Sequence, residues 1–114
     1  MLITIVTYNP DVEFVKSTID RIRQKDKNYK ILIIDNHSKV NIDNLETITD
    51  YFVQFDKNYG LGRAYNYAIK FAKELKEEYV MFLDQDTVIL DNFNANKVVK
   101  EAEELKKEES IHLF

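Results

Sequence analysis

The chain has no cysteine, only one proline and only two glycines among its 114 residues. Without cysteine, it can form neither a disulfide framework nor a thiolate metal site. No apolar run reaches the roughly 18 residues of a membrane span, and no signal-peptide pattern opens the sequence. These absences predict a protein of the cytoplasm whose stability depends on an apolar core.

Charged residues are numerous and of mixed sign, with 20 acidic and 16 basic side chains and a net charge of −4. Because Lys and Arg are scattered among acids, no concentrated basic face is expected, and nucleic acid is not predicted as a partner. A small phosphorylated ligand held through a bridging cation is compatible with this charge. The length and the hydrophobic content of 45% predict one globular domain spanning residues 1–114.

Short apolar runs alternate with segments of helical periodicity. The runs predict buried strands at residues 2–8, 29–35, 51–56 and 79–84, and "SIHLF" at residues 110–114 predicts the start of a fifth. Helices are predicted after Pro10, from Leu61 to Leu75 and from Asn94 to Glu109, with the polar segment 36–44 as a loop. Strands that alternate with helices pair in parallel through right-handed crossovers, which predicts a three-layer α/β/α sandwich.

Each of the first four predicted strands ends in side chains that can hydrogen-bond or coordinate a cation. The ends read Thr7-Tyr8-Asn9, Asp35-Asn36-His37-Ser38, Asp56-Lys57-Asn58 and Asp84-Gln85-Asp86-Thr87. Ligands of such sheets bind beyond the carboxyl ends of the strands, where these four groups would meet. One polar end is ordinary turn chemistry, whereas four at one edge predict a binding site.

The two acids in "VMFLDQDTVIL" are candidate metal ligands. Asp84 and Asp86 repel each other and resist desolvation, so the pair needs a compensating interaction. Capping of a turn is one explanation, and a divalent cation that takes oxygen ligands is the other. Alternation along an extended segment would place both carboxylates on one side and Gln85 on the other. The polar ends of the other strands favour the cation.

The two glycines, Gly60 and Gly62, occur together in "NYGLGRAYNYAI" and open a predicted helix. Glycine is needed where φ is positive or where another group approaches the backbone closely. Unpaired amides at a helix start could face an anion, but the spacing matches neither the Walker nor the dinucleotide fingerprint. A phosphate-binding loop and a tight turn with close helix packing therefore both remain open.

Four segments in order, "TIVTYN", "ILIIDNHS", "NYGLGRAYNYAI" and "YVMFLDQDT", resemble the donor-binding half of a family 2 glycosyltransferase. The resemblance covers nearly the whole chain and implies the GT-A fold, the nucleotide-diphospho-sugar transferase type of α/β sandwich. The "FLDQDT" segment is similar to that of rhamnosyltransferase-like members in particular. His37 stands where the family usually has glycine, and because histidine tolerates positive φ better than most residues, it is expected to form the turn.

The resemblance also implies a role for each motif residue. In the family, the acid-x-acid motif binds a Mn²⁺ or Mg²⁺ ion on the nucleotide diphosphate. This makes Asp86 the direct metal ligand and gives Asp84 a contact with ribose or with a metal-bound water, so both belong to the metal site. The residues implied to bind the nucleotide-sugar are Asp84 and Gln85, Thr7, Tyr8 and Asn9 around the base, Asp35 and Asn36 on base or ribose, and Asn58, Gly62, Ala64 and Asn66 beneath the nucleotide.

The implied reaction is inverting transfer of a sugar, with rhamnose as a candidate, from a dTDP- or UDP-linked donor to the hydroxyl of a glycan or lipid-linked acceptor. In the family, the catalytic base comes from a later segment, so the base is expected beyond Phe114 and the domain is expected to be incomplete. The isolated chain is therefore predicted to bind donor without transferring sugar and to self-associate through the truncated sheet edge. It is expected in the cytoplasm, where it can also lie peripherally on the inner face of the membrane.

Three other protein classes share parts of this pattern. Haloacid-dehalogenase phosphatases carry their acid motif on the first strand with threonine two positions after the second acid, whereas Thr87 follows Asp86 directly. Receiver domains need an acid pair after the first strand, where this chain has Tyr8 and Asn9. A non-catalytic nucleotide-sugar-binding module would keep every motif, and this alternative stays open.

Overall fold

One parallel β-sheet runs through the molecule. The computed structural model describes residues 1–106, and its strands are β1 (Leu2–Thr7), β2 (Lys30–Asp35), β3 (Tyr51–Gln54) and β4 (Val80–Asp84). They lie in the order β3-β2-β1-β4, and all three pairings are parallel. The first strand of the chain is therefore an inner strand of the sheet, flanked by β2 and β4.

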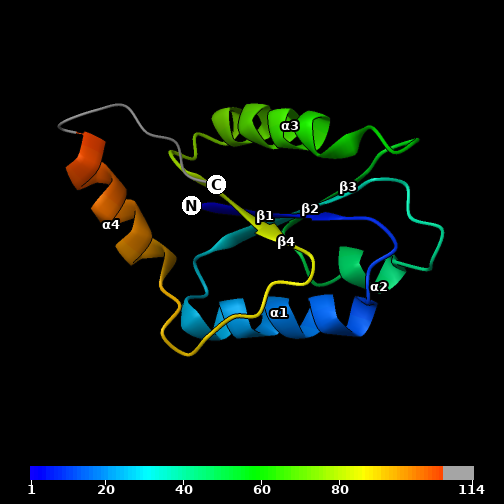
Figure 1. Ribbon diagram of the computed structural model, residues 1–114, viewed down its shortest axis with the longest axis horizontal. Coiled ribbons are helices and arrows are strands. Elements are labelled where there is room, and N and C mark those ends of the chain that lie inside the picture. The colour runs from blue at the N-terminus through cyan, green and yellow to red at the C-terminus, as the bar shows by residue number, and fades with distance from the viewer. Residues whose placement is uncertain (107–114) are drawn as a thin grey trace.

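Helices cover both faces of the sheet. They are α1 (Val12–Lys25), α2 (Asp43–Glu46), α3 (Gly60–Glu74) and α4 (Ala95–Lys106). Figure 1 shows α1 and α2 on one face and α3 on the other, with α4 near the ends at which the strands begin. This arrangement confirms the predicted three-layer α/β/α sandwich. Within residues 1–106, no helix is long and apolar enough to span a bilayer.

The apolar core has two parts, because successive residues of a strand point to opposite faces of the sheet. On one face, isoleucines of β1 and β2 meet the apolar stripe of α1, formed by Val15, Ile19 and Ile22. On the other face, leucine and isoleucine side chains of the same strands meet three small residues of α3, which are Ala64, Ala68 and Ala72. Since β1 and β2 are buried on both sides, they are apolar along nearly their whole length, which is why the sequence predicts them well.

Some element boundaries depend on groups that periodicity does not reveal. Helix α1 begins at Val12, close to Pro10 as predicted, and Asp11 caps it, since its side chain accepts a hydrogen bond from the Phe14 N–H. The polar segment 36–44 leads into α2, which begins at Asp43, has four residues and is too short for a helical period to appear. The predicted fifth strand, "SIHLF", lies outside the described residues.

Two tyrosines fasten α4 near the amino ends of the strands. The Tyr29 hydroxyl accepts a hydrogen bond from the Ala95 N–H (3.1 Å), and the Tyr79 hydroxyl donates one to Glu103 (2.9 Å). Burial and this hydrogen bond raise the pKa of Tyr79 to about 12. The contacts hold α4 away from the sheet edge at which the polar strand ends meet.

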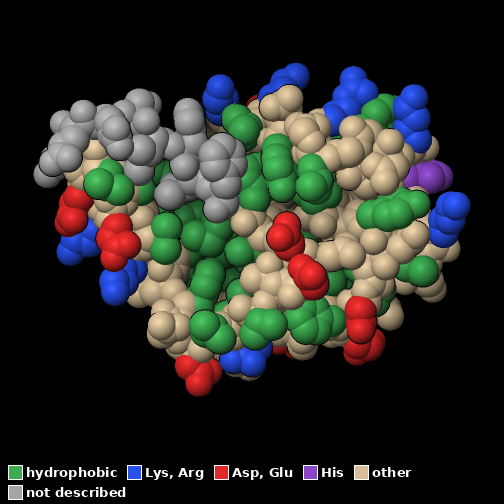
Figure 2. Space-filling view, viewed as in Figure 1, with side chains coloured by type: hydrophobic (Ala, Val, Ile, Leu, Met, Phe, Trp, Pro, Cys, Tyr) green, Lys and Arg blue, Asp and Glu red, His purple; other side chains and the backbone are tan. Residues whose placement is uncertain are grey.

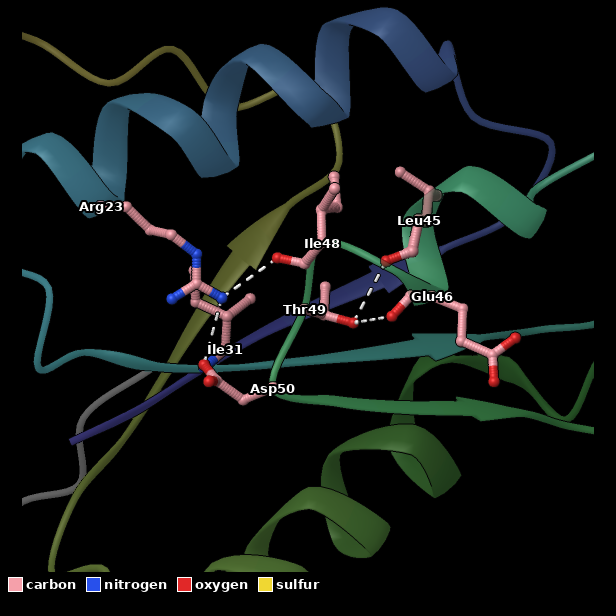
Figure 3. A network of polar contacts seen from close by, with 7 residues as sticks. All are labelled: Arg23, Ile31, Leu45, Glu46, Ile48, Thr49 and Asp50. Atoms are coloured by element: carbon pink, nitrogen blue, oxygen red, sulfur yellow. Dashed lines mark hydrogen bonds and ion pairs between the residues drawn. The ribbon is translucent and has the colours of Figure 1, made fainter.

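A polar network joins α1 to the start of β3 (Figure 3). Asp50 Oδ2 accepts hydrogen bonds from the Ile31 N–H (2.9 Å) and from Arg23 Nη2 (3.2 Å). Arg23 Nη2 also donates to the Ile48 carbonyl (3.1 Å), and the Asp50 N–H donates to the Ile31 carbonyl (3.1 Å). Asp50 therefore fixes where β3 begins to pair with β2.

Replacing Asp50 with alanine is expected to lower the free energy of unfolding by about 1–3 kcal/mol, because the N–H of buried Ile31 loses its acceptor. Asp50→Asn keeps an acceptor oxygen and loses only the charge, so its effect is expected to stay below about 1 kcal/mol. Asp43→Ala, at an exposed acid of α2, serves as the control. Urea unfolding measures all three variants, and equal losses for Asp50→Ala and Asp43→Ala would contradict this role.

Candidate functional site

A pocket of about 440 Å³ opens at the carboxyl ends of the strands. Its walls come from the ends of β1, β2 and β4 and from the segment that leads from β3 into α3. Parallel strands end at the same edge, so residues far apart in the sequence meet there. Seven residues predicted for the site line this pocket: Thr7, Tyr8, Asn36, Asn58, Asp84, Gln85 and Asp86.

Five other predicted residues do not line the pocket: Asn9, Asp35, Gly62, Ala64 and Asn66. Ala64 is fully buried in the core beneath α3, and Asn66 is exposed on that helix. At Gly62 a Cβ would meet no atom within 4 Å, so close helix packing does not explain this glycine. Asp35 accepts a hydrogen bond from Thr7, which lines the pocket, and Asn9 bonds to Ser38 and Lys39 in the loop after β2.

Asp35 is a fully buried carboxylate at the end of β2. Four donors surround it: Thr7 Oγ1 (2.6 Å), the Ser38 N–H (2.8 Å), Ser38 Oγ (2.5 Å) and Gln54 Nε2 (3.2 Å). A carboxylate offers about four acceptor sites, so this set satisfies it. Thr7 and Gln54 are the register partners of Asp35 in β1 and β3. The carboxylate therefore links the ends of three neighbouring strands.

The loop after β2 is fastened to the loop after β1. Asn9 donates its N–H to Ser38 Oγ (2.8 Å), and its side chain accepts the Lys39 N–H (2.7 Å). Asn9 and His37 both have positive φ, of 45° and 65°. The turn-forming role expected for His37 is thus confirmed, and its Nδ1 lies 3.3 Å from the Phe55 carbonyl.

The side chain of Gln85 holds the backbone of Tyr8. Its Oε1 accepts the Tyr8 N–H (2.8 Å), and its Nε2 donates to the Tyr8 carbonyl (3.3 Å). The last backbone pairing between β1 and β4 joins Val6 to Asp84, so the Gln85 amide continues this ladder with a side chain. The Tyr8 ring is 41% exposed and stands at the pocket. The sequence did not reveal this supporting role of Gln85.

Asp84 and Asp86 lie on a turn in which the Thr87 N–H donates to the Asp84 carbonyl (3.0 Å). The strand ends at Asp84, so Gln85 does not alternate with the acids as predicted, yet both carboxylates line the pocket. Within residues 1–106, no group donates a hydrogen bond to either carboxylate and no cation pairs with it. Figure 2 shows acidic side chains on the surface over the carboxyl end of β4.

The donor set at this turn suits a hard cation that is shared with a ligand. Among the described residues, no group of three or more His, Asp or Glu side chains is placed to hold a metal ion. Two carboxylates without internal partners on one wall of a pocket still fit Mg²⁺ or Mn²⁺, provided that the remaining oxygen ligands come from phosphate or water. The chemistry of the site therefore favours a cation bound together with an anionic ligand.

The start of α3 forms another wall of the pocket. Buried Asn36 accepts the Tyr59 N–H (3.3 Å), and Asn58 accepts the Gly60 N–H (2.8 Å). Because these two amides are already paired, they are not available to a phosphate. Gly60 has a φ of +83°, so the tight turn itself explains this glycine.

Tyr59 stabilises the segment that carries Asn58. Its hydroxyl donates to Asp56 (2.6 Å), and this hydrogen bond lowers the pKa of the Asp56 carboxyl and raises that of the Tyr59 hydroxyl. The guanidinium of Arg63 lies 4.5 Å from the centre of the Tyr59 ring, and Lys57 Nζ lies 5.1 Å from it. Contacts of a cation with an aromatic face are attractive, so Tyr59 is held both by the hydrogen bond of its hydroxyl and by the cations near its ring.

A comparison with known families matches this architecture and its motifs. The sequence model of Glycosyl transferase family 2 matches residues 2–108 of the chain. The chain belongs to this family. The dTDP-rhamnosyl transferase RfbF of Shigella flexneri is 30% identical over 91 residues, which cover 78% of this chain and 30% of that protein. The family 2 chain thus spans 30% of the length of this relative, and the resemblance to rhamnosyltransferase-like members is confirmed.

Gln85→Ala is expected to speed hydrogen exchange at the Tyr8 amide, because that N–H loses its acceptor while the sheet behind it is unchanged. Loss of one hydrogen bond, of order 1.4 kcal/mol, corresponds to about tenfold faster exchange. Exchange followed by NMR measures this, with Gln24→Ala on exposed α1 surface as the matched control. If exchange became faster throughout β1, or did not become faster at Tyr8, Gln85 would not be the group that holds this loop.

Proposed function

We propose that this family 2 chain binds a nucleotide-diphospho-sugar, linked to dTDP or UDP, together with Mn²⁺ or Mg²⁺. The whole enzyme would transfer the sugar, with inversion, to an acceptor hydroxyl. The observation that carries the proposal is the single pocket in which both carboxylates meet polar residues from the ends of β1, β2 and β4. The similarity to a protein named dTDP-rhamnosyl transferase supports dTDP and rhamnose as the first candidates for base and sugar.

The side chains around the pocket suit the parts of such a donor. The exposed ring of Tyr8 offers a stacking surface for a base, and Asn36 and Asn58 offer amide groups beside it. Asp84 and Asp86 supply two oxygen ligands for a cation that the diphosphate would share. A bound cation offsets the negative charge that develops on the leaving diphosphate.

Transfer also requires a general base that reaches the acceptor hydroxyl. Among the described residues that line the pocket, the acids are Asp84 and Asp86, and the proposal assigns both to the cation. We therefore place the base outside residues 1–106, in a segment beyond Phe114. The alternative, a non-catalytic nucleotide-sugar-binding module, would use the same pocket. Sugar transfer by a longer form of the protein, and none by this chain, would distinguish the enzyme from the module.

With Mn²⁺ present, dTDP or UDP is expected to raise the melting temperature of the chain, whereas AMP is not. Ligand at about 100 times its dissociation constant adds roughly 2.7 kcal/mol to the free energy of unfolding. Titration calorimetry with and without Mn²⁺ gives the affinity directly. No heat with either nucleotide and any divalent cation would refute the proposed donor site.

Asp86→Asn is expected to weaken Mn²⁺-dependent nucleotide binding by more than the roughly 10- to 100-fold that is typical for loss of an outer-shell partner of a metal. The side chain is exposed and has no partner within residues 1–106, so the fold is expected to survive. Asp43→Asn on α2 removes the same charge far from the pocket and serves as the control. Equal affinity of Asp86→Asn and the unmodified chain would exclude a metal ligand at this position, and unfolding would favour structural capping.

A further inference from the structure

One segment of the chain carries an excess of positive charge. Residues 57–73 contain four cations, Lys57, Arg63, Lys70 and Lys73, and no Asp or Glu, although the whole chain has a net charge of −4. Lys and Arg are scattered among acids over the chain as a whole, but within this segment no acid separates them. It forms the turn before α3 and α3 as far as Lys73. Asp56 precedes the segment, and Glu74, the last residue of α3, follows it.

The cations form a stripe on the side of α3 that faces away from the sheet. Arg63, Asn66, Lys70 and Lys73 follow one another at spacings of three or four residues, which places them on one side of a helix, and all four are exposed. Figure 2 shows Lys and Arg side chains along the border of the molecule where α3 lies in Figure 1. Within residues 1–106, none of the four cations forms an ion pair with an acid. Exposed Glu74 lies on the same side, four residues after Lys70, so this face carries three cations and one acid. Its remaining positive charge is available to an external anion.

Apolar side chains flank the stripe. Tyr67 and Ile69 are each 37% exposed, and they belong to turns of α3 that also carry the cations. On the inner side of the helix, Ala64, Ala68 and Ala72 are buried. Because the small apolar face of α3 is packed on the sheet, attraction between the cations and anionic headgroups would supply most of the affinity for a lipid surface, and the partly exposed Tyr67 and Ile69 would add apolar contact.

We propose that the outer face of α3, formed by Arg63, Asn66, Tyr67, Ile69, Lys70 and Lys73, docks on a lipid surface rich in anionic headgroups. Charge complementarity selects this partner, because the basic stripe meets a negative surface potential and the flanking Tyr67 and Ile69 can enter the headgroup region. A nucleic acid would use the cations but would leave Ile69 without a contact. The face lies across the sheet from α1, where acids and bases are mixed.

Docking through this face would also place the pocket beside the membrane. Gly60 and Leu61, the first residues of α3, line the pocket, so the helix that meets the lipid leads directly to it. A pocket beside the membrane favours an acceptor hydroxyl carried on a lipid, and this consequence rests on the proposed donor site. Binding of the chain to lipid does not depend on it.

The test is sedimentation of the purified chain with vesicles, in the absence of nucleotide. Binding is expected with vesicles of phosphatidylcholine mixed with phosphatidylglycerol and not with phosphatidylcholine alone, and it should weaken as salt is added. The Lys70→Gln/Lys73→Gln double variant is expected to lower the partition coefficient about 25-fold, since each cation at an anionic surface contributes about 1 kcal/mol, or roughly fivefold. Ile69→Ser is expected to weaken binding without changing its dependence on salt.

The matched control is Lys16→Gln/Lys27→Gln, which removes two charges on and beside α1. An equal loss in this control, or equal binding to both kinds of vesicle, would overturn the proposal. Tighter binding to a duplex DNA fragment than to the anionic vesicles, with no effect of Ile69→Ser, would replace it with a nucleic-acid surface. Nucleotide affinity, measured on the same variants, should not change, so failure of lipid docking and failure of the donor site are separate results.

Discussion

The buried carboxylate of Asp35 is the interaction on which the site depends most. A carboxylate removed from water is tolerated only when its oxygens are hydrogen-bonded, and here the donors come from β1, β3 and the loop after β2. The Ser38 hydroxyl donates to Asp35 and also accepts the Asn9 N–H. Asp35 is thereby connected, through Ser38, to the loop that carries Tyr8. One charged group at the sheet edge thus positions three strand ends at once.

The polar groups of the pocket are divided between folding and binding. The side chains of Asn36, Asn58 and Gln85 accept hydrogen bonds from backbone N–H groups, which belong to Tyr59, Gly60 and Tyr8 respectively. These bonds hold the walls of the pocket in place before any ligand binds. Asp84 and Asp86 make no such bonds within residues 1–106. A site whose walls are ordered in advance loses less conformational entropy when it binds, and the two acids are the groups that a ligand has left to satisfy.

The sequence predicts the strands well because β1 and β2 are buried on both faces and therefore read as continuous β-branched runs. It also predicts that the polar strand ends share one pocket, because parallel strands end at the same edge. It does not predict α2, which is too short to show a period, or the capping of α1 by the side chain of Asp11. The partnership of Gln85 with Tyr8 and the burial of Asp35 depend on contacts between distant residues, and no local pattern encodes them.

The position of β1 inside the sheet has a consequence for the order in which the protein is made. Leu2 pairs with Lys30 on one side and with Val80 on the other, so one edge of β1 can pair only after β4, which is synthesised much later. At about 5–20 residues per second, one edge of this apolar strand stays unpaired for several seconds of synthesis. An unpaired apolar edge attracts other strands. The nascent chain therefore needs protection from aggregation until β4 has been made.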